Sequence, residues 1–175
     1  GFVITCVGDE RAYSYLPSRK GNTLADRAAK NVLNQSIGNY VQYSFLERGS
    51  DERQYCSPRI DLPVCSVMRS KYGTYPEYHT SLDNLDLISP LALQQSYDLI
   101  KKIIEVIQTN DIYEAAHFCE PQLSKYGLRS TLSNKDWNLK SKLVSDILAY
   151  SDGRNDLIEI SNLLGEDALK IYELQ

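Results

Sequence analysis

The residues Phe2–Val7 form a short, apolar, β-branched run without alternating polar side chains. This pattern predicts a strand that is buried on both faces, as in parallel sheets covered by helices. A capping-box pattern at Thr23–Asp26 then predicts a helix that runs to about Ser36 and is stopped by Gly38. A buried strand followed by a helix indicates an α/β fold.

Two further strands and a long helix continue this pattern. Tyr40–Leu46 alternates and is rich in β-formers, and Leu62–Met68 follows as a third strand. Ser89 and Pro90 then supply an N-cap and a first-turn proline for a helix. We therefore predict a mostly parallel sheet with flanking helices. The predicted buried stripe of the long helix is Leu93, Tyr97, Ile100, Ile104 and Ile107.

The C-terminal part of the sequence predicts short helices joined by tight turns. They cover Asp136–Tyr150, Leu157–Leu164 and Glu166–Leu174, with a turn at 151–153. This pattern resembles a helix-turn-helix core and predicts a small, all-α, winged-helix-like module. We expect a first domain at 1–114, a connector at 115–132, and a truncated helix-turn-helix-like module at 133–175.

The charge of this module argues against DNA binding. From residue 133 onward there are five Lys or Arg and eight Asp or Glu, a net charge of −3. Contacts to phosphate supply most of the non-specific affinity for DNA, so an acidic module is expected to bind DNA poorly. We expect no nucleic-acid partner, although a transcription regulator remains an alternative.

Composition indicates a cytoplasmic globular protein. The chain is 42% hydrophobic and 24% charged, with a net charge of −4. No apolar run approaches the roughly 20 residues that span a bilayer, and the first residues do not form a signal peptide. No CxxC spacing is present, so the cysteines are expected to be reduced and mostly buried. We expect no membrane partner, and a homo-oligomer remains open.

The segment Thr74–Asp86 holds His79 between tyrosines and carboxylates. It follows the third predicted strand, at the sheet edge where α/β proteins bind ligands. A histidine in such a loop is typical of a metal ligand or a general base, and a surface histidine in a polar turn is the alternative. The polar loop Gly49–Tyr55 follows the second strand and should reach the same edge.

Several segments together resemble one family. They look like the C-terminal half of bacterial aminopeptidase-like proteins, zinc peptidases of the phosphorylase/hydrolase-like fold that end in a winged helix-turn-helix domain. The order and spacing of the matches agree across most of the chain. The matching stretches are residues 1–8, 13–15, 23–27, 49–56, 61–64, 75–83 and 119–123.

The resemblance implies roles for individual residues. His79 would be the last protein ligand of one catalytic zinc ion. Asp83 would fix the tautomer of the His79 imidazole without binding the metal itself. Asp51 and Glu52 are the implied catalytic carboxylates. The substrate-binding candidates in this part are Arg53, Tyr55 and Tyr78. Glu120 is a further candidate, because a glutamate before a proline in the connector could reach back to the cleft.

The family's upstream His-x-Asp ligands and acidic base have no counterpart in the sequence, so residues outside this chain would complete the zinc site. Thr5 or Cys6 stands where classical aminopeptidases carry a ligand aspartate, with Asp9 nearby. The expected function is a zinc-dependent aminopeptidase-like hydrolase of peptide or amide bonds, with a peptide or amino-acid-derived substrate. An inactive binding or scaffold protein is the alternative. His117 is expected to be a packed structural histidine.

Overall fold

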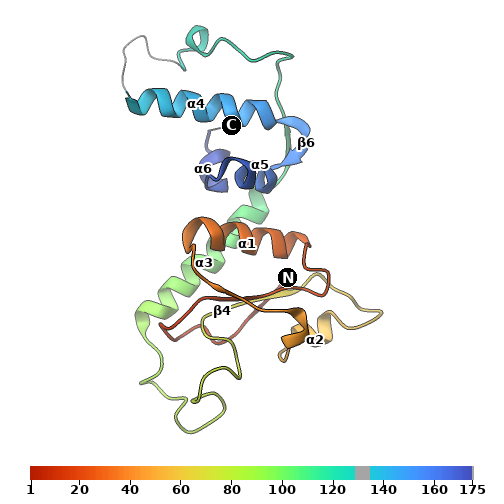
Figure 1. Cartoon of the computed structure of the whole chain (residues 1–175), viewed down its shortest axis with the longest axis vertical. Helices are drawn as coiled ribbons and strands as arrows, with labels where there is room; N and C mark the ends of the chain where they lie inside the picture. The colour runs from red at the N-terminus through yellow and green to blue at the C-terminus, as the bar shows by residue number, and fades with distance from the viewer. Residues whose placement is uncertain (129–134, 175) are drawn as a thin grey trace. The chain divides into compact units, whose positions relative to one another are not determined.

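The computed structural model describes residues 1–128 and 135–174. It divides the chain into two compact units, residues 1–108 and 109–175 (Figure 1). The predicted boundary at residue 114 and the described part of the predicted connector lie inside the second unit. Within the described ranges, no helix has the length and apolar character needed to cross a membrane.

The first unit is built on a four-stranded sheet of order β1-β4-β2-β3. Its strands are β1 (Phe2–Ile4), β2 (Ser14–Leu16), β3 (Val41–Gln42) and β4 (Cys65–Met68). The pairs β1–β4 and β2–β3 are parallel, whereas β2 and β4 are antiparallel. The predicted α/β class is confirmed, with one antiparallel pair inside a mostly parallel sheet.

The strands differ from their predicted bounds for local reasons. β1 stops at Ile4 because Cys6 takes a left-handed backbone conformation with φ of 49°. β3 is short because Ser44 and Glu47 form a capping box that starts the 3₁₀ helix η1 (Phe45–Glu47). The fully buried strand β2 was not predicted, because its tyrosines and neighbouring basic residues suggested a loop.

The helix α1 (Leu24–Ser36) is confirmed, with Thr23 and Asp26 forming its capping box. Asp26 is fully buried and also accepts hydrogen bonds from the Tyr15 hydroxyl at 2.7 Å and the Ser18 amide at 2.8 Å. Burial raises the pKa of Asp26, but hydrogen bonds from Ser18, Thr23 and Tyr15 outweigh it and leave the pKa below its usual value. One carboxylate therefore joins α1 to the centre of the sheet.

The helix α3 (Pro90–Thr109) is also confirmed, and the Ser89 hydroxyl accepts from the Ala92 amide at 3.0 Å as its N-cap. The predicted buried stripe is wrong, because Leu93, Tyr97 and Ile104 are exposed. The sequence carries two neighbouring apolar stripes, and packing selects the one with smaller side chains. The buried residues are Ala92, Ser96, Leu99, Ile103 and Val106.

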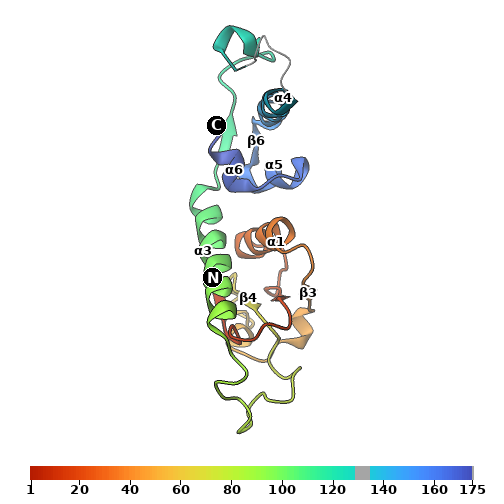
Figure 2. The ribbon, with the colours of Figure 1, turned by 90° about the vertical axis from the view of Figure 1, so that its left-hand side faces the viewer.

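Helices and loops cover different faces of the sheet. The helix α1 packs against β4 and lies on the opposite side of it from the short helix α2 (Glu52–Tyr55) in Figure 1. The Lys102 ammonium on α3 donates to the Ser36 hydroxyl at the end of α1 at 3.0 Å, and Figure 2 shows α1 nearly end-on beside α3. Glu52 of α2 accepts a hydrogen bond from the Ser66 hydroxyl of β4 at 3.1 Å, so α2 is bound directly to the sheet.

The second unit is mainly helical. Its helices are η2 (Leu123–Tyr126), α4 (Lys135–Tyr150), α5 (Leu157–Leu164) and α6 (Ala168–Tyr172). The bounds of α5 match the prediction, and Gly165 ends it with φ of 66°. The unit is not all-α, since β5 (Ile112–Glu114) pairs antiparallel with β6 (Asp152–Asp156). β6 was predicted as a turn because its sequence, Asp-Gly-Arg-Asn-Asp, is wholly polar.

Candidate active-site cavity

A cavity of about 400 Å³ opens in the first unit at the carboxyl end of β1. Residues 5–9 form one wall, and the tyrosine-rich segment around His79 forms another. This edge of the sheet is where α/β proteins bind ligands. The remaining lining residues are Leu87, Ile88 and Leu93.

Asp9 holds the first wall in place. Its carboxylate is buried, accepting from the Ser70 hydroxyl at 2.7 Å, the Ser70 amide at 2.9 Å and the Arg11 amide at 3.0 Å. The Arg69 guanidinium donates to the Asp9 carbonyl at 2.7 Å. Both carboxylate oxygens are thus engaged, which favours a structural role for Asp9 over metal binding.

An ion pair ties this wall to the histidine segment. The Arg11 guanidinium makes two hydrogen bonds to the Glu77 carboxylate, at 2.7 and 2.9 Å. The hydrogen bond from Arg11 lowers the pKa of Glu77 to about 2. Because the pair is exposed to solvent, it adds little to the free energy of unfolding, and its main effect is to hold the histidine segment in position.

Cys6 contributes a thiol to the lining of the cavity. Its thiol accepts a hydrogen bond from the Tyr75 hydroxyl, with an oxygen–sulfur distance of 3.4 Å. Burial, and then this hydrogen bond, raise the pKa of Tyr75, so Tyr75 is a neutral donor at ordinary pH. The left-handed backbone at Cys6 is uncommon for a residue with a side chain and turns the chain sharply after β1.

His79 lines the same cavity from the other side. Its backbone is also left-handed, with φ of 57°, and its exposed ring stacks on Tyr78 at a centroid distance of 4.0 Å. Tyr78 in turn contacts Tyr75 edge-on at 5.7 Å. These ring contacts hold the plane of the imidazole in place and leave the imidazole open to the cavity.

Asp83 also lines the cavity, as predicted for a residue close to His79. Among the described residues, however, no hydrogen bond joins Asp83 to His79. Its orienting role stays a prediction. The structure thus brings together three of the predicted site residues, His79, Tyr78 and Asp83.

Glu52 does not line this cavity, and its side chain is fully buried. Its carboxylate accepts from the Gly49 and Ser50 amides at 2.9 and 3.0 Å, the Tyr72 hydroxyl at 2.5 Å and the Ser66 hydroxyl at 3.1 Å. Burial raises the pKa of Glu52, but the bonds from Tyr72 and the two amides outweigh it and lower the pKa overall. This arrangement favours a structural role over the predicted catalytic one.

The neighbours of Glu52 are exposed. Asp51, Arg53 and Tyr55 face outward, and none of them lines the cavity. Asp51 precedes α2 without capping it through its side chain. The roles predicted for these three residues toward a substrate remain predictions. A substrate would have to extend beyond the cavity to contact them.

Tyr72 is a link that sequence reasoning missed. Its hydroxyl binds Glu52 and accepts from the Gly49 amide at 2.8 Å, while its ring lies 6.5 Å from that of Tyr78. Gly49 must be glycine because a Cβ there would lie 2.8 Å from the Tyr72 ring. One tyrosine therefore joins the loop of Asp51 to the segment of His79.

The donor chemistry of the cavity fits zinc in part. Imidazole, thiol and carboxylate groups are the common zinc ligands, and His79, Cys6 and Asp83 supply one of each. Across residues 1–128 and 135–174, no cluster of three or more His, Cys, Asp or Glu side chains is arranged to hold a metal ion. A zinc site here would need ligands from outside these residues.

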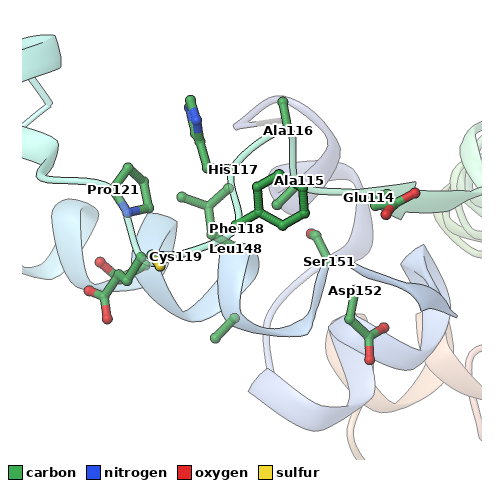
Figure 3. Close-up of a pocket in the computed structure, with 13 residues that line it drawn as sticks. Glu114, Ala115, Ala116, His117, Phe118, Cys119, Pro121, Leu148, Ser151 and Asp152 are labelled. Carbon is green, nitrogen blue, oxygen red and sulfur yellow. The ribbon is translucent and has the colours of Figure 1, made fainter.

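The other predicted residues lie in the second unit. Glu120 and His117 line a separate cavity, shown in Figure 3, and the role of Glu120 toward a substrate stays a prediction. His117 is exposed, with its ring 5.9 Å from that of Tyr126, so the expectation of a packed histidine is wrong. All four cysteines are free, and Cys56 and Cys65 are buried.

Comparisons with known proteins agree with this architecture. Residues 1–110 match the model described as "Domain of unknown function (DUF4910)", and residues 111–175 match a winged helix-turn-helix model. A Clostridium acetobutylicum protein, named a candidate polysaccharide biosynthesis protein with aminopeptidase-like domain, is 37% identical over 98% of this chain. The chain covers 40% of that relative's length.

A crystal structure of a candidate peptidase from Clostridium acetobutylicum has the same fold. It superimposes with a TM-score of 0.86 and 35% identity over 99% of this chain, which covers 38% of that protein. Fold and cavity together define a peptidase-like α/β unit followed by a winged helix-turn-helix unit. By its family model, the chain belongs to the DUF4910 family, described as a domain of unknown function.

Proposed function

We propose that this chain is part of a zinc-dependent aminopeptidase-like hydrolase that cleaves peptide or amide bonds. The observation that carries the proposal is the cavity at the carboxyl end of β1, which His79, Cys6 and Asp83 all line, within a peptidase-like fold. A bound zinc ion would polarise the scissile carbonyl and lower the pKa of a water molecule. Since the chain spans about 40% of its relative, the remaining ligands would come from the rest of the protein.

The residues of this chain would act mainly by positioning. His79 would donate one nitrogen to the metal, with its ring plane set by stacking on Tyr78. The Arg11–Glu77 pair would hold the segment that carries the imidazole. Arg53 would pair with a substrate carboxylate, because a guanidinium forms two parallel hydrogen bonds with it.

Turnover distinguishes the hydrolase from an inactive scaffold. The longest natural form of the protein is expected to release amino acids from a panel of aminoacyl substrates. His79→Ala should lower the rate by at least about 100-fold, because loss of a metal ligand removes the Lewis acid. His117→Ala is the matched control and should keep the wild-type rate.

Binding of the panel without any release would contradict the proposal. It would favour the alternative of a binding or scaffold protein that retains the peptidase fold. That alternative is motivated by the lack of a three-ligand cluster among the described residues.

We also propose that the winged-helix unit does not bind nucleic acid. The last helix, α6, begins at the acidic cap Asp167, and its Lys170 is paired with Glu166 at 2.6 Å. A gel-shift titration with 20-base-pair duplex DNA at about 50 mM salt is expected to show no complex up to micromolar protein, since few cations are available to neutralise phosphates. A salt-dependent shift would instead support a transcription regulator.

A further inference from the structure

The second unit holds a cleft of about 700 Å³ that has no part in the proposed hydrolase mechanism. One wall is the segment 114–121, and the other is the C-terminal end of α4 with the first residues after it. Figure 3 shows this segment running from Glu114 to Pro121, with Leu148 and Ser151 beside it. A volume of this size accommodates a few residues of a peptide.

The cleft has a negative charge. Three carboxylates line it, from Glu114, Glu120 and Asp152, and its described lining contains no lysine or arginine. Within the described ranges, neither Glu114 nor Glu120 forms an ion pair. The C-terminal end of α4 adds the negative end of a helix dipole to the same place. These charges all favour a cation.

The cleft also offers an apolar surface. Leu148 and Ala149 contribute aliphatic groups from α4, and Ala115 adds another from the opposite wall. The ring of Phe118 is completely exposed, with a relative exposure of 107%. Large aromatic side chains of this kind are the usual anchors of peptide and protein interfaces.

The backbone of the same segment is open to a partner. The Ala115 amide donates to the Ser151 carbonyl at 2.8 Å, just after the end of β5. Residues 116–121 make no backbone hydrogen bond to any other described residue. Peptide-binding proteins use such free N–H and C=O groups to pair with an extended ligand.

We propose that this cleft binds a peptide segment that carries lysine or arginine next to an apolar side chain. The cation lies against the carboxylate of Glu114 and the Oδ2 atom of Asp152, since Asp152 Oδ1 already accepts from Arg154 and Asn155. The apolar side chain packs on Phe118 and Leu148. The ligand is a peptide because charge, apolar surface and free backbone groups occur together, whereas the negative charge repels nucleic acid. This inference is independent of the proposed zinc site.

The test uses the chain as it stands and a fluorescein-labelled peptide, acetyl-Ala-Arg-Leu-Arg-Ala-amide, followed by fluorescence anisotropy. The analogue with glutamate in place of arginine is expected to bind at least about 10-fold more weakly. Phe118→Ala should weaken binding of the arginine peptide by about 5- to 30-fold. Glu114→Gln should weaken it by about 3-fold at low salt and reduce its salt dependence.

Leu163→Ala and Glu173→Gln are the matched controls, since both residues are exposed in the same unit and lie outside the cleft. They should bind like the wild type. Glu120 is left unchanged because it is a predicted substrate contact of the hydrolase. Chemical shifts that move on peptide addition should cluster at residues 114–121 and at the end of α4.

Three results with the two peptides and the variants would overturn the proposal. They are no binding of the arginine peptide up to about 1 mM, equal binding of the two peptides, and equal losses in the cleft variants and their controls. Spermidine provides the final comparison. If it binds as tightly as the arginine peptide and is insensitive to Phe118→Ala, the cleft is a polyamine site and the peptide proposal is wrong.

Discussion

Glu52→Ala is expected to destabilise the first unit by about 3 kcal/mol, because it leaves buried donors without their charged acceptor. The carboxylate binds groups from residues 49, 50, 66 and 72, so its loss separates α2 from the sheet. Guanidinium unfolding followed by tyrosine fluorescence measures the change. The exposed neighbour provides the control, since Asp51→Ala should change stability by less than about 0.5 kcal/mol.

The same carboxylate gives stability a pH dependence. The folded-state pKa of Glu52 is lowered, so its contribution is fully present above the unfolded-state pKa of about 4.3. It is lost as the pH falls through the lower folded-state pKa. Tyr72→Phe should cost about 1 kcal/mol, and its effect should not add to that of Glu52→Ala. Equal effects of Glu52→Ala and Asp51→Ala would contradict the structural role.

The helices with local end signals were predictable from the sequence. Thr23 and Asp26 define the start of α1, and Gly165 defines the end of α5, through contacts within a few residues. The strands β2 and β6 were not predictable in this way. Tyr15 is buried only because Asp26 satisfies its hydroxyl, and β6 exists only because β5 pairs with it. The buried face of α3 was wrong because its two apolar stripes differ only in packing.

The candidate site shows the same division between local and distant information. The segment of His79 stood out by its residue types, and the structure places it on a cavity with Asp83. The structural role of Glu52 could not be predicted, because two of its donors, Ser66 and Tyr72, lie 14 and 20 residues away. The place of Cys6 in the cavity that His79 also lines depends on the turn after β1, which no local pattern specifies.

His79→Ala is expected to remove zinc from the protein. In the proposed zinc site, the imidazole of His79 would be the histidine ligand that this chain supplies. Loss of one ligand from a catalytic zinc site, which usually has three protein ligands, would lower metal affinity by orders of magnitude. The other histidine of the chain, His117, is exposed in the second unit and makes a matched control. Circular dichroism should show both variants folded, because neither ring is buried.

The zinc content of the longest natural form of the protein, measured by elemental analysis after extensive dialysis, decides whether a metal site forms at His79. We expect about one zinc ion per chain in the wild type and in His117→Ala, and almost none in His79→Ala. A wild-type protein without stoichiometric zinc, or a His79→Ala variant that retains it, would rule out the proposed zinc site.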